Sequence, residues 1–209
     1  MASPEILLGF VIATLIFGYM PGPALVYTAA QTMAFGRQGG FKAALGLHVG
    51  GYVHVFAAAL GLAVILELVP TLFTVIKLFG AAYLVWLGIA MIRAGATPAD
   101  LPEIQQRSAR RAFLNSMLVE ILNPKTALFF LAFLPQFVDP AGALPAWSQL
   151  LILGTVVNLT FSSADIVAVF MTDQILNRMR NSSRLQKWMK WAGGSILVGL
   201  GINLAASRS

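Results

Sequence analysis

Cysteine is absent from this sequence, and charged residues are scarce. Without cysteine the chain has no disulfide, no thiol redox relay and no thiolate metal site. Only 11% of the 209 residues are charged and 58% are hydrophobic, whereas soluble domains carry about 25% charged residues. The mean hydropathy is +0.79. The composition therefore excludes an ordinary soluble protein and predicts a chain that lies in a lipid bilayer.

Long apolar runs occupy most of the chain instead. Six of them are long enough to cross a hydrocarbon core of about 30 Å, and they lie at residues 5–33, 43–66, 71–92, 112–137, 147–171 and 187–206. The first run has no basic N-terminal region and no A-x-A-like cleavage site. We therefore expect it to be a retained span rather than a signal peptide.

Basic residues are placed unevenly between these runs. The loops after the first, third and fifth runs hold 11 of the 14 Lys and Arg residues, namely Arg37, Lys42, Arg93, Arg107, Arg110, Arg111, Arg178, Arg180, Arg184, Lys187 and Lys190. The positive-inside rule places such loops in the cytoplasm and both termini outside. The net charge of +6 thus reflects topology and predicts no nucleic-acid partner, although phosphate binding by the arginines is left open as an alternative.

The two halves of the chain carry an internal repeat. Residues 77–89 align without gaps on residues 190–202, with seven identities over thirteen positions. Three spans per half would make the second half enter the membrane the opposite way up. The sequence predicts an all-α polytopic membrane protein with six transmembrane helices in two inverted three-helix repeats, residues 1–93 and 112–209, joined by a cytoplasmic linker at 94–111. Chance similarity between two apolar helices is the alternative.

Proline motifs interrupt the first and fourth spans at matching places. Pro21-Gly22-Pro23 lies halfway along the first and Asn123-Pro124-Lys125 halfway along the fourth. Proline lacks a backbone donor and clashes with the carbonyl four residues earlier, so helices 1 and 4 should be broken at mid-depth. The first motif would free the carbonyl groups of Phe17 and Tyr19, and the second would free that of Glu120. Paired interruptions of this kind are typical of transporter binding sites.

The chain resembles the LysE/RhtB family of amino-acid exporters over essentially its whole length. The residues that carry the resemblance are Pro21-Gly22-Pro23, the turn from Gly36-Arg37 to Gly39, the run from Ala44 through Gly46 to Gly50 with His54, the segment from Gly80 to Ile89, Asn123-Pro124-Lys125, and Leu134-Pro135-Gln136-Phe137. The resemblance implies a six-helix inner-membrane exporter of amino acids or close derivatives that is driven by the proton gradient. It implies no cofactor.

A zwitterionic substrate needs both donors and acceptors at mid-depth. Lys125 would meet its carboxylate, and the freed carbonyl groups would meet its ammonium group. The predicted substrate contacts are Lys125, Asn123, Pro124, Pro21, Gly22, Pro23, Phe17, Tyr19, Asp165 and Asn158. The alternative for Lys125 is a structural ion pair with Glu120, which on a regular helix would point about 140° away.

The fifth span carries a polar stripe. Its members are Thr155, Asn158, Ser162, Asp165 and Thr172, spaced by 3, 4, 3 and 7 residues, which keeps them within about 100° of one helix face. An aspartate inside a span indicates a proton or ammonium site that faces a wet interior. Hydrogen bonding between helices is the alternative explanation of the stripe.

His54 is the second candidate for proton coupling, beside Asp165. Gly46, Gly50 and His54 are spaced by four residues and therefore share one helix face. The glycines on that face would allow close contact with another helix, so His54 should point inward. A neutral histidine bonded within the core fits the pattern equally well. His48 lies on another face and is predicted to be interfacial. Because the two histidines face apart, we expect no metal site.

The leading hypothesis is a secondary transporter of the bacterial inner membrane that exports a small amino acid or derivative by proton antiport. Its expected partners are the amino acid, protons and the lipid bilayer, and self-association into a homo-oligomer is left open. One alternative is an intramembrane enzyme that uses His54, Asp165 or Lys125 as acid or base, although no G-x-S-x-G motif is present. The other alternative is a channel or assembly subunit.

Overall fold

The computed structural model describes residues 3–62 and 109–181, with single positions between 75 and 93 and between 191 and 206. Within residues 3–62 and 109–181 every regular element is helical. The elements are α1 (Pro4–Tyr19), α2 (Pro23–Phe56), the π-helical turn η1 (Ala57–Leu62), α5 (Ala109–Ile121), α6 (Pro124–Leu128), the π-helical turn η2 (Phe129–Phe133), the 3₁₀ turn η3 (Leu134–Phe137) and α7 (Ala146–Asn181).

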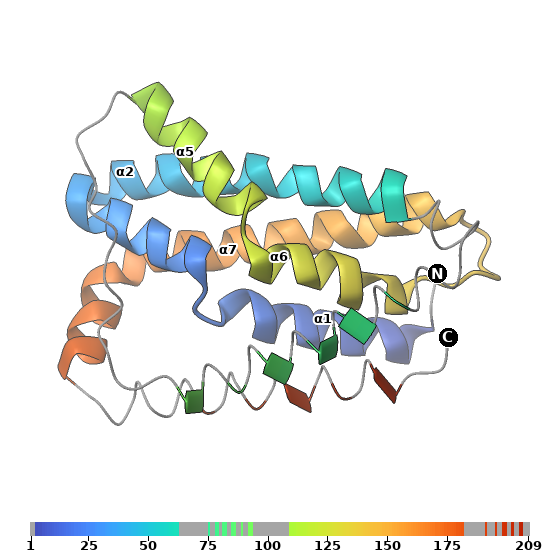
Figure 1. Cartoon of the computed structure of the whole chain (residues 1–209). Helices are drawn as coiled ribbons and strands as arrows, with labels where there is room; N and C mark the ends of the chain where they lie inside the picture. The colour runs from blue at the N-terminus through green and yellow to red at the C-terminus, as the bar shows by residue number, and fades with distance from the viewer. Residues whose placement is uncertain are drawn as a thin grey trace.

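The predicted break in the first span is confirmed between α1 and α2. Met20 leaves the helix with φ −71° and ψ 128°, because a residue before proline is disfavoured in the α-helical conformation. Gly22 is extended, and α2 begins at Pro23, a position where a missing N–H breaks no helical hydrogen bond. The break lies about halfway along the bundle in Figure 1.

A second interruption lies inside α2, at Gly36. Its φ of 68° and ψ of −174° suit glycine because no side chain clashes there. Figure 1 shows α2 doubling back within its first half, from the blue segment into the cyan one. Residues 37–62 then correspond to the predicted second span, and Gly36 is the first residue of the turn expected at residues 36–39.

The predicted break in the fourth span is confirmed between α5 and α6. Phe113–Ile121 and Pro124–Phe137 are bent by 42°, and Figure 1 shows the connection between them beside the middle of α2 and α7. Asn123 caps α6, since its Oδ1 accepts a hydrogen bond from the backbone N–H of Lys125 at 3.1 Å. The proline motif therefore ends one helix and starts another within the same predicted span.

Glycines bring α2 and α5 into close contact. A Cβ atom on Gly46 would lie 2.7 Å from the carbonyl oxygen of Phe113, and one on Gly50 would lie 2.7 Å from that of Met117. Because real Cβ atoms do not approach this closely, the backbones can pack here only through glycine. The predicted role of these glycines in helix contact is confirmed.

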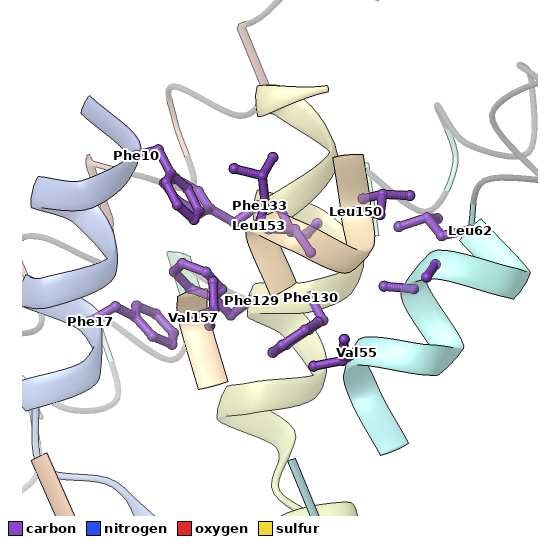
Figure 2. Close-up of a cluster of buried hydrophobic side chains, with 14 of the residues drawn as sticks. Phe10, Phe17, Val55, Leu62, Phe129, Phe130, Phe133, Leu150, Leu153 and Val157 are labelled. Carbon is purple, nitrogen blue, oxygen red and sulfur yellow. The ribbon is translucent and has the colours of Figure 1, made fainter. Parts of the chain in front are cut away.

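An apolar core fills the space between α1, η1, η2 and α7 (Figure 2). Its buried side chains include Phe10, Phe17, Val55, Leu62, Phe129, Phe130, Phe133, Leu150, Leu153 and Val157. Aromatic rings contact one another within this core. The ring centroids of Phe17 and Phe129 are 4.8 Å apart, and those of Phe129 and Phe161 are 5.5 Å apart. This packing fixes the position of α1 beside the break in the fourth span.

The described part of the chain is that of an all-helical membrane protein. Pro23–Leu62 and Ala146–Thr172 are long and apolar enough to cross a membrane, and the bent pair between Phe113 and Phe137 makes a third candidate. The predicted spans at 71–92 and 187–206 and the repeat between 77–89 and 190–202 lie largely outside the described residues. The predicted linker at 94–111 also lies outside them, apart from the start of α5 at Ala109.

Candidate functional site at the two helix breaks

The two helix breaks meet at the side chain of Lys125. This residue is 8% exposed, and its Nζ donates a hydrogen bond to the carbonyl oxygen of Met20 at 2.6 Å. Its stem crosses Gly22, where an added Cβ would lie 2.7 Å from Lys125 Cδ. The close approach explains a glycine between the two prolines. A charge on the first turn of α6 is thus held by backbone at the C-terminus of α1.

The acceptor that Lys125 uses was not among the predicted ones. Sequence reasoning assigned the freed carbonyl groups to Phe17 and Tyr19, yet the Phe17 carbonyl accepts from the N–H of Met20 at 3.3 Å. Met20 itself precedes Pro21 and turns its carbonyl group out of the helix. The preference of pre-proline residues for extended backbone is the signal that would have identified it.

The carbonyl group freed by Pro124 has two donors within the protein. Glu120 O accepts from the backbone N–H of Asn123 at 3.0 Å and from Nε2 of His54, which lies 2.9 Å away. A carbonyl oxygen only accepts, so Nε2 carries the proton in this bond. His54 points inward as predicted, and the bond fits the alternative of a histidine held within the core.

The side chain of Glu120 belongs to the site, although sequence reasoning considered it only as an ion-pair partner of Lys125. Glu120 is 5% exposed. Its Oε1 accepts from the hydroxyl of Thr126 at 2.7 Å, and its Oε2 accepts from the amide of Asn123 at 3.0 Å. These neutral donors, rather than Lys125, hold the carboxylate. An acidic residue inside an apolar run is itself the signal that could have placed Glu120 in the site.

Asp165 joins the site from α7. It is 5% exposed, and its Oδ1 accepts a hydrogen bond from the hydroxyl of Thr28 at 3.3 Å. Asp165 lines a small cavity whose walls are Gly18, Gly22, Ala24, Leu25, Glu120, Asn123, Lys125, Thr126, Phe161 and Asp165. Its volume is about 20 Å³, room for roughly one water molecule. The ammonium group of Lys125 and the carboxyl groups of Glu120 and Asp165 therefore share one small cavity.

Aromatic rings complete the surroundings of Lys125. Its Nζ lies 5.1 Å from the ring centroid of Phe17 and 5.6 Å from that of Phe161. Both distances are within reach of a cation–π interaction. Phe17 was predicted to contribute its backbone carbonyl, whereas here its ring contacts the site. Phe161 was not predicted, because nothing in the sequence distinguishes it from other apolar residues of the fifth span.

The remaining predicted residues are placed as follows. Lys125, Asn123, Gly22 and Asp165 line the cavity, whereas Pro21, Pro23 and Pro124 shape the two breaks. Tyr19 is 45% exposed, and its hydroxyl lies 3.1 Å from Ser163 Oγ.

The polar stripe of α7 faces the interior, as predicted. Asn158 donates from Nδ2 to the carbonyl oxygen of His48 at 3.1 Å, and Ser162 Oγ lies 2.6 Å from Nδ1 of His48. Asn158 and Ser162 thus make the hydrogen bonds between helices that were the alternative explanation. The ring of His48 thus reaches across to α7, and its expected place at the membrane interface stays a prediction. Among the described residues no group of His, Asp and Glu could hold a metal ion.

Comparison with known proteins identifies relatives along nearly the whole chain. The model of the LysE type translocator family matches residues 15–208. An uncharacterized membrane protein PA4757 of Pseudomonas aeruginosa is 31% identical over 203 residues, which covers 95% of this chain and 94% of the relative. The threonine efflux protein of Escherichia coli (strain K12) is 30% identical over 195 residues, 90% of this chain and 91% of that protein.

A more distant relative has a different amino acid in its name. The leucine efflux protein of Klebsiella pneumoniae is 27% identical over 203 residues and covers 97% of this chain and 95% of that protein. No solved structure matches the chain significantly. These two functionally named relatives are both efflux proteins that the chain covers over more than nine tenths of their length, and their names differ in the amino acid.

Proposed function

Because the chain belongs to the LysE type translocator family, we propose that it exports a small neutral amino acid or a close derivative across a bacterial inner membrane in exchange for protons. Membership in this family makes the chain a transporter and not an enzyme. The similarity to proteins named threonine and leucine efflux proteins supports amino-acid export. It also favours a neutral substrate over a basic or acidic one.

The contact between the two helix breaks is the observation that carries the proposal. An amino acid presents a carboxylate and an ammonium group, and both must stay solvated inside the membrane. Lys125 supplies the cation for the carboxylate, and the Met20 carbonyl supplies an acceptor beside it. A site built on broken helices at mid-depth is the arrangement that secondary transporters use for such substrates.

The whole architecture that we propose contains six transmembrane helices. Residues 1–93 and 112–209 would form two inverted three-helix repeats, joined by a cytoplasmic linker at 94–111, with both termini outside. Three observations support it: the sequence repeat, the distribution of basic residues, and helix breaks at equivalent places in the two halves. In an inverted repeat, equivalent breaks face one another across the middle of the membrane.

Asp165 is the residue that we propose as the principal proton carrier. Its carboxylate lines the same cavity as Lys125, so its charge state acts directly on the field around the substrate. Protonation would remove a negative charge from beside the substrate carboxylate and deprotonation would restore it. Such a change couples proton movement to substrate affinity. His54, which bonds to the carbonyl of Glu120, is proposed as a secondary participant.

Efflux from proteoliposomes tests the proposal. Vesicles that contain the purified chain are loaded with one amino acid at a time, and release is measured with and without a pH difference in which the outside is acidic. We expect saturable, gradient-dependent release of at least one small neutral amino acid. Release of none, or release that rises linearly with concentration and ignores the gradient, would reject proton-coupled export and favour a channel.

Lys125→Ala tests the site itself. Lys125 is the only cation among the described residues that line the cavity. Removing it should reduce export at least about a hundredfold, because an unpaired substrate carboxylate in this setting costs several kcal/mol. The control is Lys42→Ala, which removes the same charge from an exposed position. Membrane abundance should stay near the wild-type level in both variants. Wild-type export by the Lys125 variant would contradict a substrate contact.

A further inference from the structure

The ammonium group of Lys125 lies in surroundings that would suit any primary ammonium ion. The carbonyl oxygen of Met20 accepts a hydrogen bond from it over 2.6 Å, and the ring centroids of Phe17 and Phe161 lie 5.1 and 5.6 Å away. Both nearby carboxylates accept from other donors, Glu120 from Thr126 and Asn123, and Asp165 from Thr28. A carbonyl oxygen and two ring faces do not distinguish a tethered ammonium from a free one.

We propose that Lys125 occupies, in the empty transporter, the subsite for the ammonium group of the substrate. This inference rests on the proposed function and extends it. An entering amino acid places its own ammonium group on the Met20 carbonyl and the two rings. The displaced Lys125 then turns to the substrate carboxylate. The cavity of about 20 Å³ has no room for an amino acid beside the lysine in its present position, so this exchange opens the site.

The exchange makes the transporter selective for zwitterions. An amine without a carboxylate would displace Lys125 and leave its charge unpaired in a buried position, which is unfavourable. A carboxylic acid without an ammonium group would draw Lys125 away and leave the Met20 carbonyl without its donor. Only a molecule that carries both groups replaces every interaction that it breaks. Selectivity for amino acids thus follows from one side chain with two alternative positions.

Binding of amines to the purified full-length chain tests the exchange. The probes are 1-amino-2-propanol and 3-methylbutan-1-amine, which correspond to threonine and leucine without their carboxylates, and affinity is measured by calorimetry in detergent. Removing a like charge from a few ångströms away should make Lys125→Met bind both amines at least about tenfold more tightly than wild type. Lys125→Gln should behave in the same way, and Lys42→Met should leave amine binding unchanged.

Phe161 identifies the place where the amine binds. Adding Phe161→Leu to the Lys125→Met variant should weaken amine binding about fivefold, because one cation–π contact is lost. Failure of both Lys125 variants to gain amine affinity would overturn the exchange. A gain in affinity that Phe161→Leu leaves untouched would also overturn it, since the amine would then bind elsewhere.

A measurement on the wild-type protein needs no substitution. Acetate supplies the partner that displaced Lys125 requires, so saturating acetate should raise the affinity for 1-amino-2-propanol at least about threefold, as linkage between two ligands demands. Affinity that is independent of acetate would contradict the inference. If vesicles release amino acids but these binding results fail, only the exchange is wrong. If no amino acid is released, the proposed function is wrong whatever the amines do.

Discussion

At the scale of single residues, Gly22 matters because its missing side chain leaves space for Lys125. Gly22 is extended, with φ −144° and ψ −179°, so its backbone does not require glycine. Glycine is favoured here because the stem of Lys125 passes directly over this residue. A Cβ atom on Gly22 would lie only 2.7 Å from Cδ of Lys125. A side chain at this position would displace the lysine stem from its present path to the Met20 carbonyl group.

Gly22→Ala should therefore impair transport more than folding. The added methyl group pushes the flexible stem of Lys125 aside, so we expect export to fall at least about tenfold, consistent with the loss of one charge-assisted hydrogen bond. The midpoint of thermal unfolding should change little. Gly9→Ala is the matched control, because nothing lies within 4 Å of a Cβ atom there. Normal export by the Gly22 variant would show that Lys125 does not need its present position.

His54 allows structural and coupling roles to be separated at one residue. His54→Ala removes one of the two donors to the Glu120 carbonyl group and leaves the N–H of Asn123, so it should lower the free energy of unfolding by about 0.5–1.5 kcal/mol, the net contribution of one hydrogen bond. His54→Gln keeps an amide donor and should recover most of that loss in thermal unfolding measurements. If His54 carries protons, the glutamine variant will fold well and export without response to the pH gradient. A glutamine variant with normal gradient dependence would limit His54 to the structural role.

At the scale of helices, the contact between α2 and α5 depends on a small-residue face. Gly50→Ala places a methyl group 2.7 Å from the carbonyl oxygen of Met117 and should lower the free energy of unfolding by about 1–3 kcal/mol through overpacking. The control is Gly61→Ala, where an added Cβ meets nothing within 4 Å. Both variants are compared by thermal unfolding in the same detergent. Equal stability of the two would contradict the close packing of these helices.

The helix breaks were predictable because their causes are local. Proline removes a donor and restricts its neighbour wherever it occurs, so the motifs at Pro21 and Pro124 locate both breaks without knowledge of the fold. The pre-proline rule marks the Met20 carbonyl group as free of the helix, but no local rule pairs it with Lys125, which lies 105 positions away in the sequence. The same holds for His54 and Glu120, which meet only because Gly46 and Gly50 bring two helices together. Sequence reasoning therefore identified Lys125 and Asp165, which line one cavity, and missed the Met20 carbonyl group that accepts the hydrogen bond from Lys125.

At the scale of the whole molecule, the apolar core and the polar site occupy different parts of the described bundle. Aromatic side chains pack from Phe10 through Phe129 on one side of the breaks (Figure 2), and the charged cavity lies where Phe17 and Phe161 end that packing. Opening the cavity to a substrate requires these rings to move relative to Lys125. The transport cycle should therefore change the packing of α1 against α7, which Tyr19 and Ser163 also connect.

The orientation of the chain in the membrane can be tested cleanly because the protein has no cysteine. A single cysteine at Gln38, exposed beside the turn at Gly36, should react with a membrane-impermeant maleimide only from the cytoplasmic side. A single cysteine at Ala141, exposed before α7, should react only from outside. The positive-inside rule requires this pattern, since Arg37 and Lys42 flank the first position and no basic residue lies near the second. The reverse labelling pattern would turn the whole topology over and place both termini in the cytoplasm. In that case the loops that we place in the cytoplasm would face the acidic outside. Protons that drive export would then have to reach Asp165 from the other side of the bundle.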